Sequence, residues 1–147
     1  MSLKPLTQTD ILNHWIDLHK SRNFYMLKQE TTVEFEYKNY SGSRILSGRL
    51  RFHCLPSEEL IFSRSVDWPE ILREKECDSA VLQGIVDGLF MKKFYPYTGC
   101  KLECVEIGWH EVHSVVAAYY FAAFGAMQEL RAKGSWDITP RKNSPNS

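Results

Sequence analysis

The chain has 147 residues, of which 44% are hydrophobic and 24% charged, a composition typical of a globular protein with one core. Lys and Arg together number 18 and Asp and Glu together number 18, so the overall positive charge of a non-specific nucleic-acid binder is absent. Any contact with nucleic acid is therefore expected to be local. The sequence shows neither a signal-peptide pattern nor an apolar run of transmembrane length, which predicts a cytoplasmic protein without membrane contact.

The first third of the chain predicts a helix followed by strands. Apolar residues at helical spacing between 9 and 19 predict an amphipathic N-terminal helix. Alternating apolar and polar residues at 32–38 and 49–54 predict two half-buried strands, and 59–62 begins a third. Residues 39–43 have turn composition, and Gly48 is expected to be a second flexible point.

The rest of the chain predicts two helices around one strand. The charged run Arg73–Glu76 is expected to be a solvated connector, before a helix that Asp78 or Ser79 caps and that reaches Leu89. A strand is predicted at 101–107. The longest helix, 114–133, is rich in small residues that allow close approach to a sheet, and Gly134 is its expected C-terminal cap.

This order of elements predicts an α+β sandwich in one domain. About four strands would form a mainly antiparallel sheet with helices on one face, preceded by the N-terminal helix. The expected organisation is an N-terminal helical extension at 1–27, the domain at 28–134 and a disordered tail at 135–147.

Most familiar catalytic and cofactor motifs are absent from the sequence. It contains no phosphate-binding glycine loop, dinucleotide-binding glycine motif, His-Glu-x-x-His or Gly-x-Ser-x-Gly. The cysteines form no Cys-x-x-Cys pair, and Cys100 and Cys104 on one strand would lie about 13 Å apart. We therefore expect buried free thiols, no metal, no cofactor and no nucleotide.

The segment Trp109–Ser114, between a predicted strand and the last helix, carries the densest functional chemistry. Such a turn exposes backbone N–H groups at the helix start, and here it adds an indole and the imidazoles of His110 and His113. This composition suits either RNA contact or acid–base chemistry. A His110–Glu111 catalytic pair is disfavoured because adjacent strand residues point to opposite faces.

A second segment, Ser41–Gly48, connects two strands that should be antiparallel neighbours. Its glycines, Gly42 and Gly48, bracket Arg44 and would let the backbone turn and present the arginine outward. The alternative is an ordinary hairpin loop with a solvated arginine.

Together these segments resemble domain IV of translation elongation factor G. Ser41, Gly42, Arg44 and Gly48 match the family loop Ser-Gly-Gly-Arg-Gly-Gln-Tyr-Gly in register. The segments Gly84–Leu89 and Trp109–Val116 are similar to two further family motifs, and an Ala-rich helix follows. The resemblance covers roughly residues 28–133 and implies a βαβ sandwich with a left-handed crossover.

The resemblance also implies a function in translation. The two loops would lie side by side and contact RNA near the decoding site, with Ser41, Gly42, Arg44 and Gly48 in one loop and Trp109, His110 and Ser114 in the other. The sequence departs from the family at Ser43, Ile45, His113 and Val116. The GTPase and the other factor domains of the family are not found in these 147 residues, so the chain is expected to be either a free-standing relative with a changed role or a piece of something larger.

The leading hypothesis is therefore a non-enzymatic, free-standing relative that binds ribosomal RNA or a ribosome-associated partner. A competing hypothesis is a protein-interaction module that associates through the last helix, for example through Tyr119 and Tyr120. An enzyme that uses His110 and His113 is a third.

Overall fold

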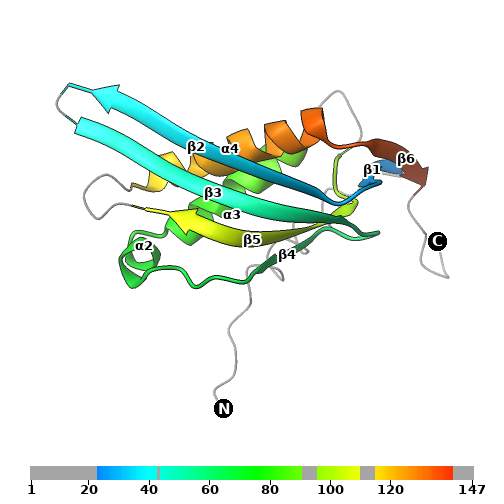
Figure 1. The fold of residues 1–147 in the computed structure, drawn as a ribbon, viewed down its shortest axis with the longest axis horizontal. Helices are drawn as coiled ribbons and strands as arrows, with labels where there is room; N and C mark the ends of the chain where they lie inside the picture. Colours follow the sequence, from blue (N-terminus) through cyan, green and yellow to red (C-terminus); the bar gives the residue numbers. More distant parts are fainter. Residues whose placement is uncertain (1–22, 43, 91–95, 110–114, 141–147) are drawn as a thin grey trace, which may run out of the picture.

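The computed structural model of the chain describes residues 23–42, 44–90, 96–109 and 115–140 (Figure 1). The predicted N-terminal helix at 9–19 and the candidate residues His110 and Ser114 lie outside these ranges.

A four-stranded sheet forms one layer of the molecule. Its strands are β2 (Thr31–Ser41), β3 (Arg44–Pro56), β4 (Ile61–Arg64) and β5 (Cys100–Gly108), in the order β2-β3-β5-β4. The β2–β3 and β3–β5 pairs are antiparallel, whereas β4 runs parallel to β5. The predicted α+β class and the mainly antiparallel sheet are thus confirmed.

Within the described residues, three helices complete the main body. They are α2 (Glu70–Glu74), α3 (Cys77–Leu89) and α4 (Val116–Lys133), and α3 and α4 cover one face of the sheet (Figure 1). Followed in Figure 1, the chain leaves β4 through α2, passes behind the sheet in α3 and returns above β4 as β5, which is a left-handed crossover. Part of the charged run expected to be a connector belongs to α2, so that expectation was wrong.

Glycines set the close packing of the two long helices and the sheet. A Cβ atom at Gly84 of α3 would lie 2.5 Å from the carbonyl oxygen of Tyr120 in α4. A Cβ atom at Gly125 of α4 would lie 2.5 Å from the ring of Phe35 in β2. The small residues of α4 therefore hold it flat against the sheet, as the sequence predicted.

The ends of the described chain form a second, two-stranded sheet. The strands β1 (Asn23–Leu27) and β6 (Trp136–Pro140) pair antiparallel. Tyr97 joins this sheet to the body, because its ring stacks on Tyr25 at 4.4 Å and meets Trp136 edge-on at 4.9 Å. The expected helical extension at 1–27 is therefore corrected at 23–27, which form strand β1. The expected disordered tail at 135–147 is corrected at 136–140, which form strand β6.

A β-bulge changes which face the end of β5 presents. The register with β3 shifts between Arg51 and Phe52, so that Cys104 pairs with Phe52 across the strands whereas Glu106 pairs with Arg51. Simple strand alternation would place Glu106 on the same face as Cys104. The bulge moves Glu106 instead to the open face of the sheet, beside the arginines of β3.

Among the described residues, no helix is both long enough and apolar enough to span a bilayer.

Candidate functional site: two tips at one end of the sheet

The first tip is a tight hairpin between β2 and β3. Ser41 and Arg44 form its last backbone pair, and Gly42 adopts a φ of 63°, which a two-residue hairpin turn requires at its first central position. The expected open loop from Ser41 to Gly48 was therefore wrong. The turn is only two residues long, and the segment Arg44–Gly48 already belongs to strand β3.

Gly48 serves packing rather than flexibility. It is buried within β3, and a Cβ atom there would lie 3.3 Å from the backbone of Ala118 and from the ring of Tyr119. The glycine thus lets the first turn of α4 approach the hairpin closely. The expectation of a second flexible point at Gly48 is corrected by this contact.

The second tip begins where β5 ends. Tyr119, fully buried in α4, donates a hydrogen bond of 2.8 Å from its hydroxyl to the carbonyl oxygen of Gly108. The next residue, Trp109, leaves 49% of its surface exposed. Helix α4 starts at Val116 without a side-chain cap at Val115. Of the predicted residues of this tip, the structure describes Trp109 alone.

The hairpin and the end of β5, where the second tip begins, lie at the same end of the sheet. Arg49 of β3 pairs with Gly108, the last residue of β5. Beyond that pair β3 continues for five residues to Arg44, which extends the hairpin roughly 16 Å past the end of β5 at strand rise. Figure 1 shows the β2–β3 hairpin projecting from the body. The expectation that the two tips lie side by side stays a prediction, because all of the second tip beyond Trp109 lies outside the described residues.

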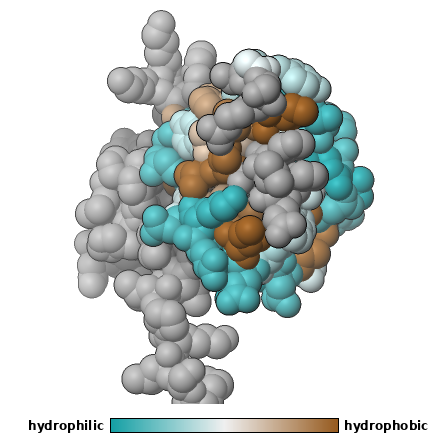
Figure 2. Space-filling view, turned by 90° about the vertical axis from the view of Figure 1, so that its left-hand side faces the viewer, coloured by the Kyte–Doolittle hydropathy of each residue, from teal (hydrophilic) through white to brown (hydrophobic). Residues whose placement is uncertain are grey.

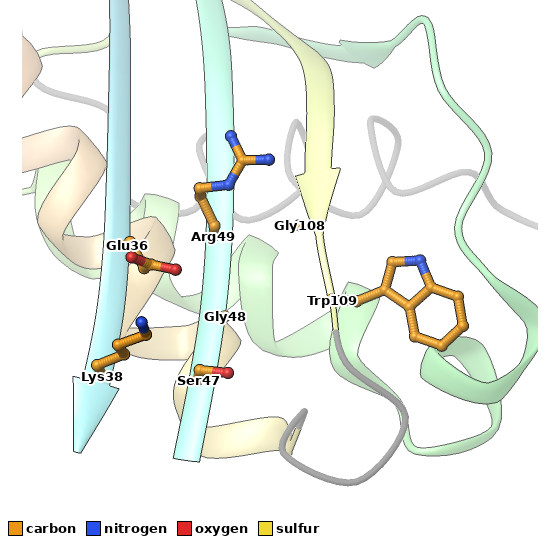
Figure 3. A pocket seen from close by; sticks show the side chains of 7 residues that line it. All are labelled: Glu36, Lys38, Ser47, Gly48, Arg49, Gly108 and Trp109. Atoms are coloured by element: carbon orange, nitrogen blue, oxygen red, sulfur yellow. The ribbon is translucent and has the colours of Figure 1, made fainter. Parts of the chain in front are cut away.

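A hollow of about 350 Å³ lies between the base of the hairpin and the second tip (Figure 3). Its lining residues come from three neighbouring strands: Glu36, Lys38, Ser47, Gly48, Arg49, Gly108 and Trp109. In Figure 3 the indole of Trp109 points to the side of β5 away from β3, which leaves the hollow open. Sequence reasoning missed this hollow, although the alternation of β2 and β3 places Glu36, Lys38 and Arg49 on one face.

The distal hairpin is strongly exposed. Tyr40 leaves 67% of its surface exposed, and Lys38 and Asn39 are also exposed. Among the described residues neither Lys38 nor Glu36 forms an ion pair. Figure 2 views the molecule from this end and shows hydrophilic and hydrophobic residues side by side.

The centre of the open face, in contrast, is an ionic network. Arg49 contacts Glu34 at 2.7 Å and also Glu106, and Arg51 contacts the same two carboxylates at 3.0 and 3.2 Å. Partial desolvation alone would raise the pKa of Glu34, but the hydrogen bonds and charges of both arginines outweigh it and lower that pKa. The hydrogen bond to Glu106 raises the pKa of Arg49. These arginines are already neutralised within the chain.

Thiol and metal chemistry find no support in the described residues. All four cysteines are free and buried, as the sequence predicted. Burial raises the pKa of Cys54 and Cys104 to about 12 and of Cys77 to about 11, so their thiols are protonated and unreactive at neutral pH. Within the described ranges no three His, Cys, Asp or Glu side chains are grouped to hold a metal ion.

Tyr119 and Tyr120 do not form the exposed aromatic surface that the sequence suggested. Tyr119 is fully buried, and the half-buried Tyr120 donates a hydrogen bond of 2.6 Å to Asp87 of α3. The hydrogen bond to Asp87 raises the pKa of Tyr120. The large apolar side chains that α4 exposes are instead Val116 and Phe121, each with 43% of its surface accessible.

Comparison with known proteins identifies the fold but no family. No family model and no curated protein sequence matches the chain. A crystal structure of a protein from Thermus thermophilus is similar, with a TM-score of 0.67 and 20% identity over 81% of this chain. The match spans 18% of that protein's length, so the fold of this chain corresponds to one part of a much longer protein.

Proposed function

We propose that the chain is a non-catalytic domain similar to domain IV of elongation factor G, which binds ribosomal RNA or a ribosome-associated partner through its two tips. The proposal rests on the resemblance of the tip sequences and on one structural observation. The hairpin that carries Ser41, Gly42 and Arg44 projects beyond the rest of the sheet at the end where Trp109 is exposed.

The chemistry of this end suits a small RNA contact. Tyr40 and Trp109 expose aromatic surface on which an unpaired base can stack, and Lys38 adds a cation that forms no ion pair within the described residues. Arg44 and the uncapped backbone N–H groups at the start of α4 would bind phosphates. The arginines of the central face contribute little, because Glu34 and Glu106 already hold them.

Co-sedimentation with ribosomes at several salt concentrations tests the proposal. We expect the wild-type chain to bind with a shallow salt dependence, because few phosphates are contacted. The double variant Arg44→Ala, His110→Ala should lose most of this binding while its circular dichroism spectrum stays unchanged. Arg51→Ala is the matched control, since it removes an arginine that is already paired, and it should bind like the wild type.

Equal ribosome binding by the wild type and the double variant would refute a contact through the tips. A second candidate function, a protein-interaction module, is favoured by the exposed Val116 and Phe121 on α4. It predicts an association that is insensitive to salt and is lost on Phe121→Ser rather than on Arg44→Ala.

A further inference from the structure

The outer edge of β2 is a long strand edge without a partner among the described residues. β2 has 11 residues and pairs with β3 in an uninterrupted register, without proline, glycine or bulge. The opposite edge of the sheet, β4, has only four residues. Exposed edges of such length promote pairing with another strand, and proteins usually shorten, bend or cover them. β2 shows little of this protection.

The hairpin turn determines which backbone groups point outward. Ser41 and Arg44 flank a two-residue turn and therefore form a hydrogen-bonded pair. Because hydrogen-bonded and non-bonded positions alternate along β2, the N–H and C=O groups of the even-numbered residues point to the free edge. Lys133 supports this assignment, since its ammonium donates a hydrogen bond of 3.1 Å to the carbonyl oxygen of Thr32. No strand among the described residues covers the edge at residues 34–40.

When the β2 edges of two copies are paired antiparallel, one register places opposite charges against each other. Glu36 and Lys38 lie on the open face and form no ion pair within the described residues, unlike Glu34, which binds Arg49 and Arg51. A twofold axis at Tyr37 would place each Lys38 opposite Glu36 of a second copy, twice in the dimer. The neighbouring registers are unfavourable, because an axis at Glu36 opposes two glutamates and an axis at Lys38 opposes two lysines.

Apolar surface lies beside the same axis. Tyr37 stacks on Phe121 of α4 with ring centroids 5.0 Å apart, and Phe121 leaves 43% of its surface exposed. The partly exposed ring of Phe121 therefore lies against Tyr37 of β2, on the helix side of the edge strand. Pairing two copies along β2 would bring these two aromatic stacks together on the helix side while the charges pair on the open side.

We propose that the chain forms a symmetric dimer in which the β2 edges of two copies pair antiparallel about Tyr37. The two sheets then join into one continuous sheet, with Lys38 of each copy opposite Glu36 of the other. Lys38 belongs both to this interface and to the RNA contact proposed above, but the tests are separate, because the RNA contact is tested at Arg44 and His110 and the dimer through the charge exchange between Glu36 and Lys38.

Charge exchange between Glu36 and Lys38 tests the dimer. Sedimentation equilibrium of the wild type should show a species of twice the 17.1 kDa chain mass that increases with concentration. Lys38→Glu and Glu36→Lys should each weaken dimerisation by roughly tenfold to a hundredfold, since each opposes like charges twice. An equimolar mixture of the two variants, and the double variant E36K/K38E, should dimerise again because the opposite charges meet once more.

Two controls make the result specific. Arg73→Glu reverses a charge on α2, across the sheet from β2, and should leave dimerisation unchanged (Figure 1). Hydrogen exchange should show that the amides of Glu34, Glu36, Lys38 and Tyr40 become protected as concentration rises, whereas odd-numbered amides of β2 are protected throughout. A wild type that stays monomeric at its solubility limit, or a mixture of variants that fails to restore the dimer, would overturn the proposal.

Discussion

The centre of the open sheet face and the distal β2–β3 hairpin differ in how their charges are used. At the centre, Arg49 and Arg51 each contact both Glu34 and Glu106, so two cations and two carboxylates neutralise each other. Farther along the same strands, Lys38 and Tyr40 project into solvent. Arginines alone therefore do not indicate a nucleic-acid surface, and Lys38, a cation without an ion pair among the described residues, lies toward the hairpin.

The two regions also differ in packing. Helices α3 and α4 cover the sheet behind Phe35, where even a single methyl group at Gly125 would collide with the ring. Gly42 in the hairpin turn, in contrast, has no atom within 4 Å of the position of a Cβ. The central region is fixed by tertiary packing, and the hairpin depends mainly on its own turn and strand pairing.

The largest expected effect is on stability and concerns one glycine from each region. Gly84→Val should lower the free energy of unfolding by about 2–3 kcal/mol, because its side chain would collide with the backbone of α4. Gly42→Ala should lower the free energy of unfolding by only about 1 kcal/mol, because alanine adopts the positive φ at this position unfavourably but its methyl group meets no other atom. Urea unfolding measures both values. Equal losses would contradict the contrast in packing.

An intermediate effect is expected for the central arginine. Arg51→Ala should lower the free energy of unfolding by less than about 1 kcal/mol, because 42% of its side chain is exposed and solvent screens its ion pairs. Thermal unfolding measures the change. A loss of several kcal/mol would mean that the network, rather than the core, holds the sheet.

The smallest effect is a dependence on pH through Glu34. Its pKa in the folded chain is lowered, so its contribution to stability is present above its unfolded pKa of about 4.3 and is lost as pH falls through the folded value. The difference in Tm between the wild type and Glu34→Gln should therefore shrink below about pH 4. A difference that stays constant down to pH 2 would show that Glu34 acts without its charge.

Local patterns in the sequence predicted the central strands and helices. The alternation of Val33, Phe35 and Tyr37 identified β2, and the small residues of α4 predicted its close contact with the sheet. Both signals depend on near neighbours along the chain. Pairing between residues far apart in the sequence leaves no comparable local signal. The strands β1 and β6 were therefore missed, since Leu27 of β1 pairs with Trp136 of β6 more than a hundred residues later.

The errors at the candidate site have the same origin. Glycine at position 48 suggested a turn, but the reason for it is the backbone of Ala118, which only the folded chain brings close. The bulge that turns Glu106 toward Arg51 breaks the simple alternation of β5. The short turn at Gly42, in contrast, has a recognisable local cause in the positive φ that glycine adopts freely.

Hydrogen exchange of the chain bound to small ribosomal subunits tests most directly whether partner contact is confined to the two tips. We expect new protection at the hairpin residues 39–46 and around Trp109, with the exchange of the central strands near Arg51 unchanged. Protection spread over the central network, or over α4 around Phe121 while the hairpin exchanges freely, would contradict this expectation.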